Sequence, residues 1–266
     1  MQNLKVSIVQ TRQFWEDKEK NLKHFEKLLE EQLLEETDVI VFPEMFHTGF
    51  SMNATSLAET IENSGGISWL QQIALSREAL CLASLIIEEN NQFYNRMVAV
   101  HPDGKVHHYD KVHLFSLAHE DQYYSPGKQR TIVHFKDWKI LLQICYDLRF
   151  PENARNSIIP SGEFEFDVIV YVANWPERRI VHWDKLLAAR AIENQCYVVA
   201  LNRVGTDNNK LTYNGSSQIL TAMGTYEIEP ILDLEQVRTT QLSMSSLAEV
   251  RKNLAFLKDR QRNLTF

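Results

Sequence analysis

The segment KILLQICYDLRFPE, residues 139–152, changes character at Cys145. Its first part is mostly apolar, as expected for a strand buried on both faces of a sheet. Its second part is polar, and Pro151 suits the first turn of a short helix. In α/β proteins, ligand-binding and catalytic groups gather where buried strands end and loops begin. The segment therefore predicts an α/β fold with Cys145 at such a strand end.

Two other apolar segments end in the same way. DVIVF, residues 38–42, runs into Pro43 and Glu44, and KVHHYD, residues 105–110, runs into Lys111. A carboxylate, an ammonium group and a thiol thus each occupy a plausible active-site position. Taken singly, each has an ordinary interpretation, because a cysteine after a strand is usually a small buried hydrophobe and charged residues at strand ends are usually solvated.

The order of apolar and polar patterns predicts alternating strands and helices over the whole chain. Strands are expected at 4–11, 38–42, 82–87, 92–100, 105–111, 132–135, 139–145, 167–172, 196–202, 215–220 and 228–234. Helices are expected at 19–34, 67–76, 181–194 and 235–256, the last with a tail. Without a linker-like stretch, residues 1–266 are expected to form one domain, with sheets inside and helices outside.

Composition disfavours several classes of function. The net charge is −7 and no basic run occurs, so nucleic acid and anionic membrane surfaces are not expected partners. No stretch approaches the ~20 apolar residues of a membrane span, and no signal peptide is evident. The cysteines are Cys81, Cys145 and Cys196. This odd, sparse set predicts no disulfide framework and a cytoplasmic, reducing location.

Metal and alternative nucleophile sites are also disfavoured. His107 and His108 are adjacent on a predicted strand, so they point to opposite faces and cannot easily share one ion. No H-E-x-x-H motif occurs, and no metal or cofactor is expected. A cysteine–histidine pair of Cys145 and His113 is conceivable, but it leaves Glu44 and Lys111 unexplained.

Three motifs together change the interpretation of these residues: FPEMFHTGF (42–50), YDKVHLF (109–115) and ICYDLRFPE (144–152). With KVSIVQT (5–11), YVANWP (171–176) and RAIENQCYVVALNRVG (190–205), they resemble the nitrilase-like carbon–nitrogen hydrolase superfamily in order and separation. CYDLRFP and KVHLF are most similar to its omega-amidase branch. The resemblance implies a four-layer α-β-β-α sandwich, a homodimer and no cofactor.

The resemblance also implies a catalytic triad of Glu44, Lys111 and Cys145, with a second family glutamate matching Glu120. Attack by Cys145 on a small amide would release ammonia and leave a thioester, which water hydrolyses. Glu44 is expected to act as base and then acid, and Lys111 to favour the thiolate and the oxyanion. The backbone N–H of Tyr146 is the expected second oxyanion donor, and Glu120 would orient substrate or water.

Omega-amidase substrates carry a carboxylate at their far end, which calls for a cation or several donors in the pocket. Candidates for the cation are Arg149, Arg178 and Arg203. Candidates for aromatic walls are Phe115, Tyr123 and Trp175. For Arg149, a scaffold role in an ion pair with Asp147 or Glu152 is also expected.

The chain departs from the family pattern at Ser216 and at Thr221-Ala222, where many relatives carry other residues. The resemblance therefore does not determine which residues support the site and shape the substrate pocket. An N-carbamoyl hydrolase or a nitrilase would use the same triad on another small molecule. A non-catalytic ligand-binding or assembly protein is the alternative from a different class, because fold does not guarantee activity.

Overall fold

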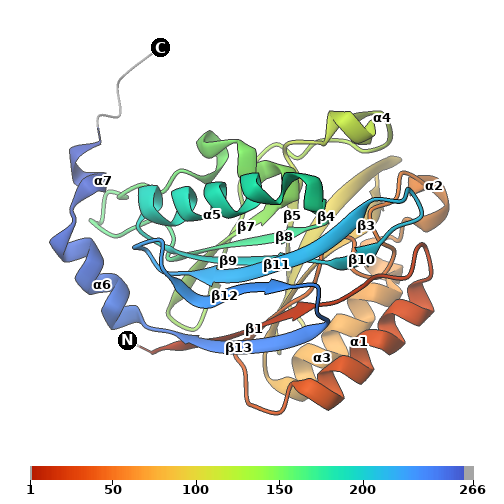
Figure 1. Cartoon of the computed structure of the whole chain (residues 1–266), viewed down its shortest axis with the longest axis horizontal. Coiled ribbons are helices and arrows are strands. Elements are labelled where there is room, and N and C mark those ends of the chain that lie inside the picture. Colours follow the sequence, from red (N-terminus) through yellow and green to blue (C-terminus); the bar gives the residue numbers. More distant parts are fainter. Residues whose placement is uncertain (1, 261–266) are drawn as a thin grey trace.

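The computed structural model describes residues 2–260, and within this range the strands form two sheets (Figure 1). The first has the strand order β13-β1-β2-β3-β4-β5. Its strands are β1 Leu4–Gln10, β2 Val39–Val41, β3 Leu80–Glu89, β4 Gln92–Val100, β5 Val106–Asp110 and β13 Gln236–Leu242. β1, β2 and β3 are parallel, and the outer pairings are antiparallel.

The second sheet repeats this plan, with parallel strands in the middle. Its order is β10-β11-β9-β8-β7-β6, and β12 pairs with β11. Its strands are β6 Ile132–Phe135, β7 Trp138–Ile144, β8 Val168–Ala173, β9 Tyr197–Asn202, β10 Val204–Thr206, β11 Thr212–Leu220 and β12 Tyr226–Leu232. β7, β8 and β9 are parallel, which accounts for their continuous apolar sequences, since both faces are buried.

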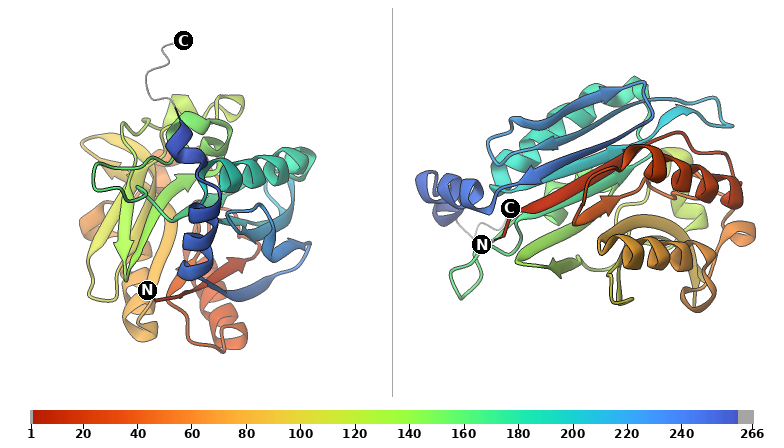
Figure 2. Two further views of the ribbon diagram at one scale, coloured as in Figure 1. Left: turned by 90° about the vertical axis from the view of Figure 1, so that its left-hand side faces the viewer. Right: turned by 90° about the horizontal axis from the view of Figure 1, so that it is seen from below.

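Three helices, α1, α3 and α5, cover the outer faces of the stacked sheets (Figure 1). The helices are α1 Lys18–Gln32, α2 Ala54–Leu57, α3 Gly65–Arg77, α4 Glu120–Tyr123, α5 Ile180–Asn194, α6 Met244–Asn253 and α7 Phe256–Asp259. α1 and α3 lie on one side of the strands and α5 on the other, in Figure 1 and in the right-hand view of Figure 2. Among the described residues, no helix combines the length and apolarity that crossing a bilayer requires.

Alternate residues of the buried strands divide the core into layers. Val6 of β1 and Ile140 of β7 belong to the cluster between the two sheets. Val9 of β1 faces the other way and packs in a cluster with Phe25 of α1. Beyond the second sheet, Trp183 of α5 belongs to a further cluster. The predicted four-layer α-β-β-α sandwich is therefore confirmed.

One predicted element is wrong. The helix expected at 235–256 is a strand over its first part: β13 pairs antiparallel with β1, from Leu4 opposite Leu242 to Gln10 opposite Gln236. Thr239 and Thr240 are β-branched residues that favour a strand, and helix α6 starts only after Ser243, whose side chain caps it by accepting the Ser246 N–H. The short strand β10 was not predicted.

Candidate active site

Glu44 follows β2 and is held by its neighbour β3. The residue after it, Met45, has a φ of +44°, a left-handed conformation that is strained for a side-chain-bearing residue. Met45 N–H donates to Ser84 Oγ at 2.7 Å, and Phe46 N–H donates to the Ser84 carbonyl at 2.9 Å. Ser84 thus fixes the turn that carries Glu44 into the interior, where its side chain is fully buried.

Lys111 follows β5 and is also fully buried. Its backbone N–H donates to the Asn95 carbonyl of β4 at 3.0 Å. Its ammonium donates to Glu44 Oε1 at 2.9 Å, and to both carboxylate oxygens of Glu120 at 3.0 and 2.9 Å. Burial opposes the charge on Lys111, but the attraction of Glu120 and Glu44 raises the pKa of its ammonium well above the ordinary value.

Cys145 follows β7 and starts a 3-10 helix over Cys145–Arg149, with a φ of +45°. Asp147 braces this turn, since its carboxylate accepts the N–H of Ile144 at 3.0 Å and the hydroxyl of Tyr109 at 2.8 Å. Cys145 as a whole is partly exposed, but its thiol is enclosed and points toward the carbonyl of Asn174, 4.0 Å away. The strained turn therefore directs the sulfur beyond the end of β7 and away from the sheet.

Asn174, after β8, connects the two sheets at this point. Its backbone N–H donates to Glu44 Oε2 at 2.8 Å, and its side-chain amide donates to the Glu44 carbonyl at 2.7 Å. Because its own carbonyl faces Cys145, Asn174 holds the carboxylate and the thiol on one scaffold. The structure thus brings Glu44, Lys111, Glu120 and Cys145 together from the ends of different elements.

The charge balance of this group acts on the thiol in two directions. Lys111 favours the thiolate, as expected, but two carboxylates face its single ammonium. Burial, together with the negative charge of Glu44, raises the pKa of the Cys145 thiol well above its usual range. Burial also raises the pKa of Glu120. A base beside the sulfur that accepts its proton would therefore assist attack.

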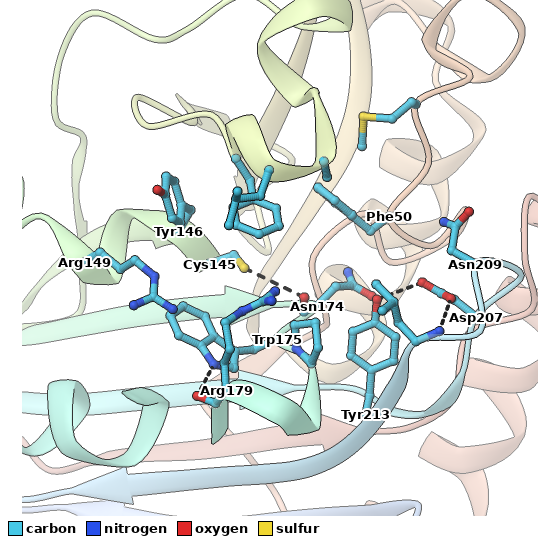
Figure 3. Close-up of a pocket in the computed structure, with 16 residues that line it drawn as sticks. Phe50, Cys145, Tyr146, Arg149, Asn174, Trp175, Arg179, Asp207, Asn209 and Tyr213 are labelled. Atoms are coloured by element: carbon cyan, nitrogen blue, oxygen red, sulfur yellow. Dashed lines mark hydrogen bonds between the residues drawn. The ribbon is translucent and has the colours of Figure 1, made fainter. Parts of the chain in front are cut away.

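A pocket of about 310 Å³ opens in front of the sulfur (Figure 3). It is lined by Phe50, Met52, Phe115, Leu117, Ala118, Cys145, Tyr146, Arg149, Asn174, Trp175, Pro176, Arg179, Asp207, Asn209, Leu211 and Tyr213. The charged side chains in this lining are Arg149, Arg179 and Asp207. Asp207 is engaged by the Leu211 N–H and the Tyr213 hydroxyl, at 2.9 and 2.8 Å. The pocket is small, aromatic and positively charged.

The two pocket arginines lie against aromatic rings. The Arg149 guanidinium is 4.6 Å from the centre of the Trp175 ring and contacts Nδ1 of His182 at 3.2 Å. The Arg179 guanidinium is 5.1 Å from the centre of the Phe115 ring. Within residues 2–260, neither guanidinium has a carboxylate partner at ion-pair distance. Both therefore remain available to an anionic ligand.

The structure places only some of the predicted pocket residues in the lining. Phe115, Arg149 and Trp175 line the pocket, whereas Tyr123 lies outside it and is 48% exposed. Arg178 is exposed outside the pocket, and its neighbour Arg179 takes the predicted place. Neighbours in a 3-10 turn, here Glu177–Arg179, point about 120° apart, so only the direction of the turn decides between them.

Arg203 is buried and serves the scaffold. Its guanidinium donates to the Gln13 carbonyl at 3.2 Å and lies 4.8 Å from the centre of the Tyr213 ring. The expected pairing of Arg149 with an acid is also wrong, because Asp147 instead accepts the backbone and ring N–H groups of His113. Since the His113 ring also stacks on another aromatic ring, the cysteine–histidine alternative finds no geometric support.

The departures from the family pattern lie outside the pocket lining. Ser216 donates to Asp184 Oδ1 at 2.8 Å, and its carbonyl accepts the indole N–H of Trp183. Thr221 closes the β11–β12 turn through Thr225. These residues support α5 and a hairpin. Within the described chain, no cluster of three or more His, Cys, Asp or Glu side chains is arranged to hold a metal ion.

Comparison with known proteins gives a consistent result. The family model described as carbon–nitrogen hydrolase matches residues 5–252. The omega-amidase YafV of Yersinia enterocolitica is 41% identical, with 97% of each chain covered. The 2-oxoglutaramate amidase of Bacillus subtilis is 32% identical, with 92% of each covered. A crystal structure of XC1258 from Xanthomonas campestris, described as a CN-hydrolase superfamily protein with an arsenic adduct in its active site, superposes with a TM-score of 0.95 at 37% identity, covering both chains completely. This chain belongs to the carbon–nitrogen hydrolase family.

Proposed function

We propose that this protein is an omega-amidase, which hydrolyses the terminal amide of short dicarboxylate monoamides such as 2-oxoglutaramate or 2-oxosuccinamate. The observation that carries the proposal is the pocket, in which a thiol faces two guanidinium groups that lack carboxylate partners. Such a pocket suits a small molecule with a reactive carbonyl at one end and a carboxylate at the other. Relatives named as omega-amidase and 2-oxoglutaramate amidase support this substrate class.

Glu44 is the proposed base for thiol attack. Its Oε1 accepts from Lys111 and Asn95, and its Oε2 accepts from Asn174 N–H, which leaves lone-pair capacity for one more donor. As sulfur bonds to the amide carbon, its proton passes to Glu44. Protonated Glu44 then donates that proton to the departing nitrogen, and ammonia leaves a thioester on Cys145.

The second half of the reaction reverses the proton transfers. A water attacks the thioester carbonyl while Glu44 takes one of its protons. The C–S bond breaks, the thiol recovers that proton, and the free acid is released. Lys111 and the backbone N–H of Tyr146 are the proposed donors to the oxyanion of both tetrahedral intermediates. Glu120 holds Lys111 through two hydrogen bonds and so orients the donor.

Arg149 and Arg179 are the proposed holders of the substrate carboxylate. Replacing either by leucine should raise KM for glutaramate about 10–100-fold, since a charge-assisted hydrogen bond contributes about 1.5–3 kcal/mol. A neutral amide such as butyramide has no carboxylate, and its kcat/KM should change little. Steady-state ammonia release with both substrates measures this difference.

Arg178→Leu is the matched control, because Arg178 neighbours Arg179 in the sequence but lies outside the pocket. Its kinetics should equal those of the wild type. Equal losses for the charged and neutral substrates in Arg149→Leu and Arg179→Leu would contradict carboxylate binding and indicate a general distortion of the pocket.

Assembly and location complete the proposal. We propose a homodimer of single-domain subunits over residues 1–266, in keeping with the family resemblance, and a cytoplasmic location, where a catalytic thiol stays reduced. Size-exclusion chromatography with light scattering should give twice the chain mass of 31.0 kDa. A mass equal to one chain at micromolar concentration would exclude the dimer.

A further inference from the structure

Asn95 lies on β4, which runs between β3 and β5 (Figure 1), and it contacts both proposed catalytic-site carboxylates. It is fully buried, and it is absent from the pocket lining. Its side-chain nitrogen donates to Glu44 Oε1 at 2.8 Å and to Glu120 Oε1 at 3.0 Å. An amide NH2 has two hydrogens, so this contact uses its full donor capacity on the two acids.

Asn95 and Lys111 bridge the same two oxygen atoms. Lys111 Nζ is 2.9 Å from Glu44 Oε1 and 3.0 Å from Glu120 Oε1. The two nitrogens and two oxygens therefore form a closed ring in which donors and acceptors alternate. Each distance is that of a good hydrogen bond. The ring fixes the separation of the two carboxylates, which would otherwise repel each other.

A hydrogen-bond chain from β3 sets the direction of this amide. The N–H of Met45 can only donate, and it donates to Ser84 Oγ at 2.7 Å. The hydroxyl of Ser84 must then donate its own hydrogen to Asn95 Oδ1, which is 3.0 Å away. The amide nitrogen is thereby directed at the carboxylates. The opposite orientation would place an amide oxygen against two negative groups.

The charges around the ring explain why an extra donor is needed there. Lys111 has three hydrogens, and all three are engaged by Glu44 and Glu120. To contact an oxyanion, Lys111 has to release one of these contacts at the moment when negative charge increases. Asn95 still donates to both Oε1 atoms at that moment, so neither buried carboxylate oxygen is left without a donor.

We propose that Asn95, oriented by Ser84, is a positioning residue for the amidase reaction: it holds Glu44 and Glu120 apart, ionised and aligned on Lys111 while the ammonium turns to the oxyanion. This inference rests on the proposed function for the roles of these groups. It extends that function by assigning part of the alignment of the catalytic groups to two uncharged residues, Ser84 on β3 and Asn95 on β4.

The proposal predicts a change in pH dependence as well as in rate. Titratable groups facing Glu44 are Lys111, Glu120, Cys145 and Tyr124. A hydrogen bond from Asn95 stabilises an ionised carboxylate more than a protonated one, so its removal favours the protonated form. The acid limb of kcat should therefore move to higher pH, by about one pH unit for one charge-assisted hydrogen bond. Turnover falls because Glu44 is misplaced.

The experiment compares Asn95→Ala, Ser84→Ala and the control Asn156→Ala with the wild type. Asn156 is an equally buried asparagine, and its amide donates to the carbonyls of Phe166 and Asn194 rather than to the active site. For Asn95→Ala we expect kcat to fall about 10–100-fold, KM to stay within about threefold, and the acid limb to shift upward. Ser84→Ala should shift the limb in the same direction by less, and Asn156→Ala should not shift it.

A second measurement needs no substrate. Alkylation of Cys145 by iodoacetamide requires loss of the thiol proton, so its rate should increase with pH. The pH profile of alkylation should move to higher pH in Asn95→Ala, together with the acid limb of kcat. Because alkylation does not depend on the amide, it tests Asn95 even if the substrate assignment fails, and thermal melting identifies a variant that does not fold.

Two results would overturn the proposal. A folded Asn95→Ala enzyme with wild-type kcat and an unchanged pH profile of alkylation would show that Glu44 and Glu120 align without it. If Asn95→Ala does not fold, Ser84→Ala takes its place in the test. The proposal would then be refuted if the pH profiles of kcat and of alkylation in Ser84→Ala coincide with those of Asn156→Ala. A wild type that hydrolyses none of the dicarboxylate monoamides, with the alkylation shift present, would refute the substrate and keep the role of Asn95.

Discussion

Replacing Cys145 by alanine is expected to reduce ammonia release by more than about 10³-fold, because no other group can form the thioester. The fold should persist, since the change removes one sulfur atom from a residue that lines the pocket, at a cost of about 1 kcal/mol. Ammonia release measures the first effect and thermal melting the second.

Cys196→Ala is the matched control for this loss. It removes the same atom from a fully buried position in the core beside α5. We expect it to lower the melting temperature more than Cys145→Ala does, and to keep most of the activity. If Cys145→Ala retained ammonia release with its fold intact, the thioester route would be refuted.

Replacing Lys111 by methionine should have the largest effect on stability. Glu44 and Glu120 would then face each other in a fully buried site without their ammonium, and breaking a buried ion pair in this way costs about 3–5 kcal/mol. Burial and the facing Glu44 already raise the pKa of Glu120, and without Lys111 it would lie further above that of the unfolded chain. Folding then takes up protons, so the variant should gain stability as the pH falls. Urea unfolding at several pH values measures this.

The double variant with Lys111→Met and Glu120→Gln separates structure from catalysis. It removes one of the two opposed carboxylates, while Glu44 keeps the donors Asn95 and Asn174. Much of the lost stability should return, but activity should not, because the oxyanion still lacks its charged donor. Recovery of both stability and turnover would show that Lys111 acts only as a counter-ion.

The elements that bear the reactive groups could be predicted from sequence because each is encoded locally. Buried parallel strands have continuous apolar sequences, and polar residues directly after them mark the sheet edge. This reasoning found the strands before Glu44, Lys111 and Cys145, and the family resemblance added Glu120. The spacing of apolar residues over 19–34 also predicted the α1 helix.

The remaining parts depend on contacts between distant segments. Asn95 lies inside β4 and gives no signal of its role, which arises only where β3, β4 and the Glu44 turn meet. The choice between Arg178 and Arg179 depends on how a 3-10 turn is oriented, and local composition does not determine this. β13 was interpreted as helix because its partner β1 lies more than 220 residues away in the sequence.

The balance of charge around Cys145 also depends on distant segments. Lys111 lowers the pKa of the thiol, as expected, but burial and both carboxylates raise it and outweigh Lys111. The sum of charges in a buried site can be found only when every member of the site is known.

The most direct test is ammonia release by wild type and Cys145→Ala on 2-oxoglutaramate, 2-oxosuccinamate, glutaramate, succinamate, glutamine, a carbamoyl-β-amino acid and a simple nitrile. We predict turnover of the dicarboxylate monoamides by the wild type, and its loss in the variant. Turnover restricted to the carbamoyl compound or the nitrile would contradict the substrate assignment, and equal ammonia release by the two proteins would contradict the role of Cys145.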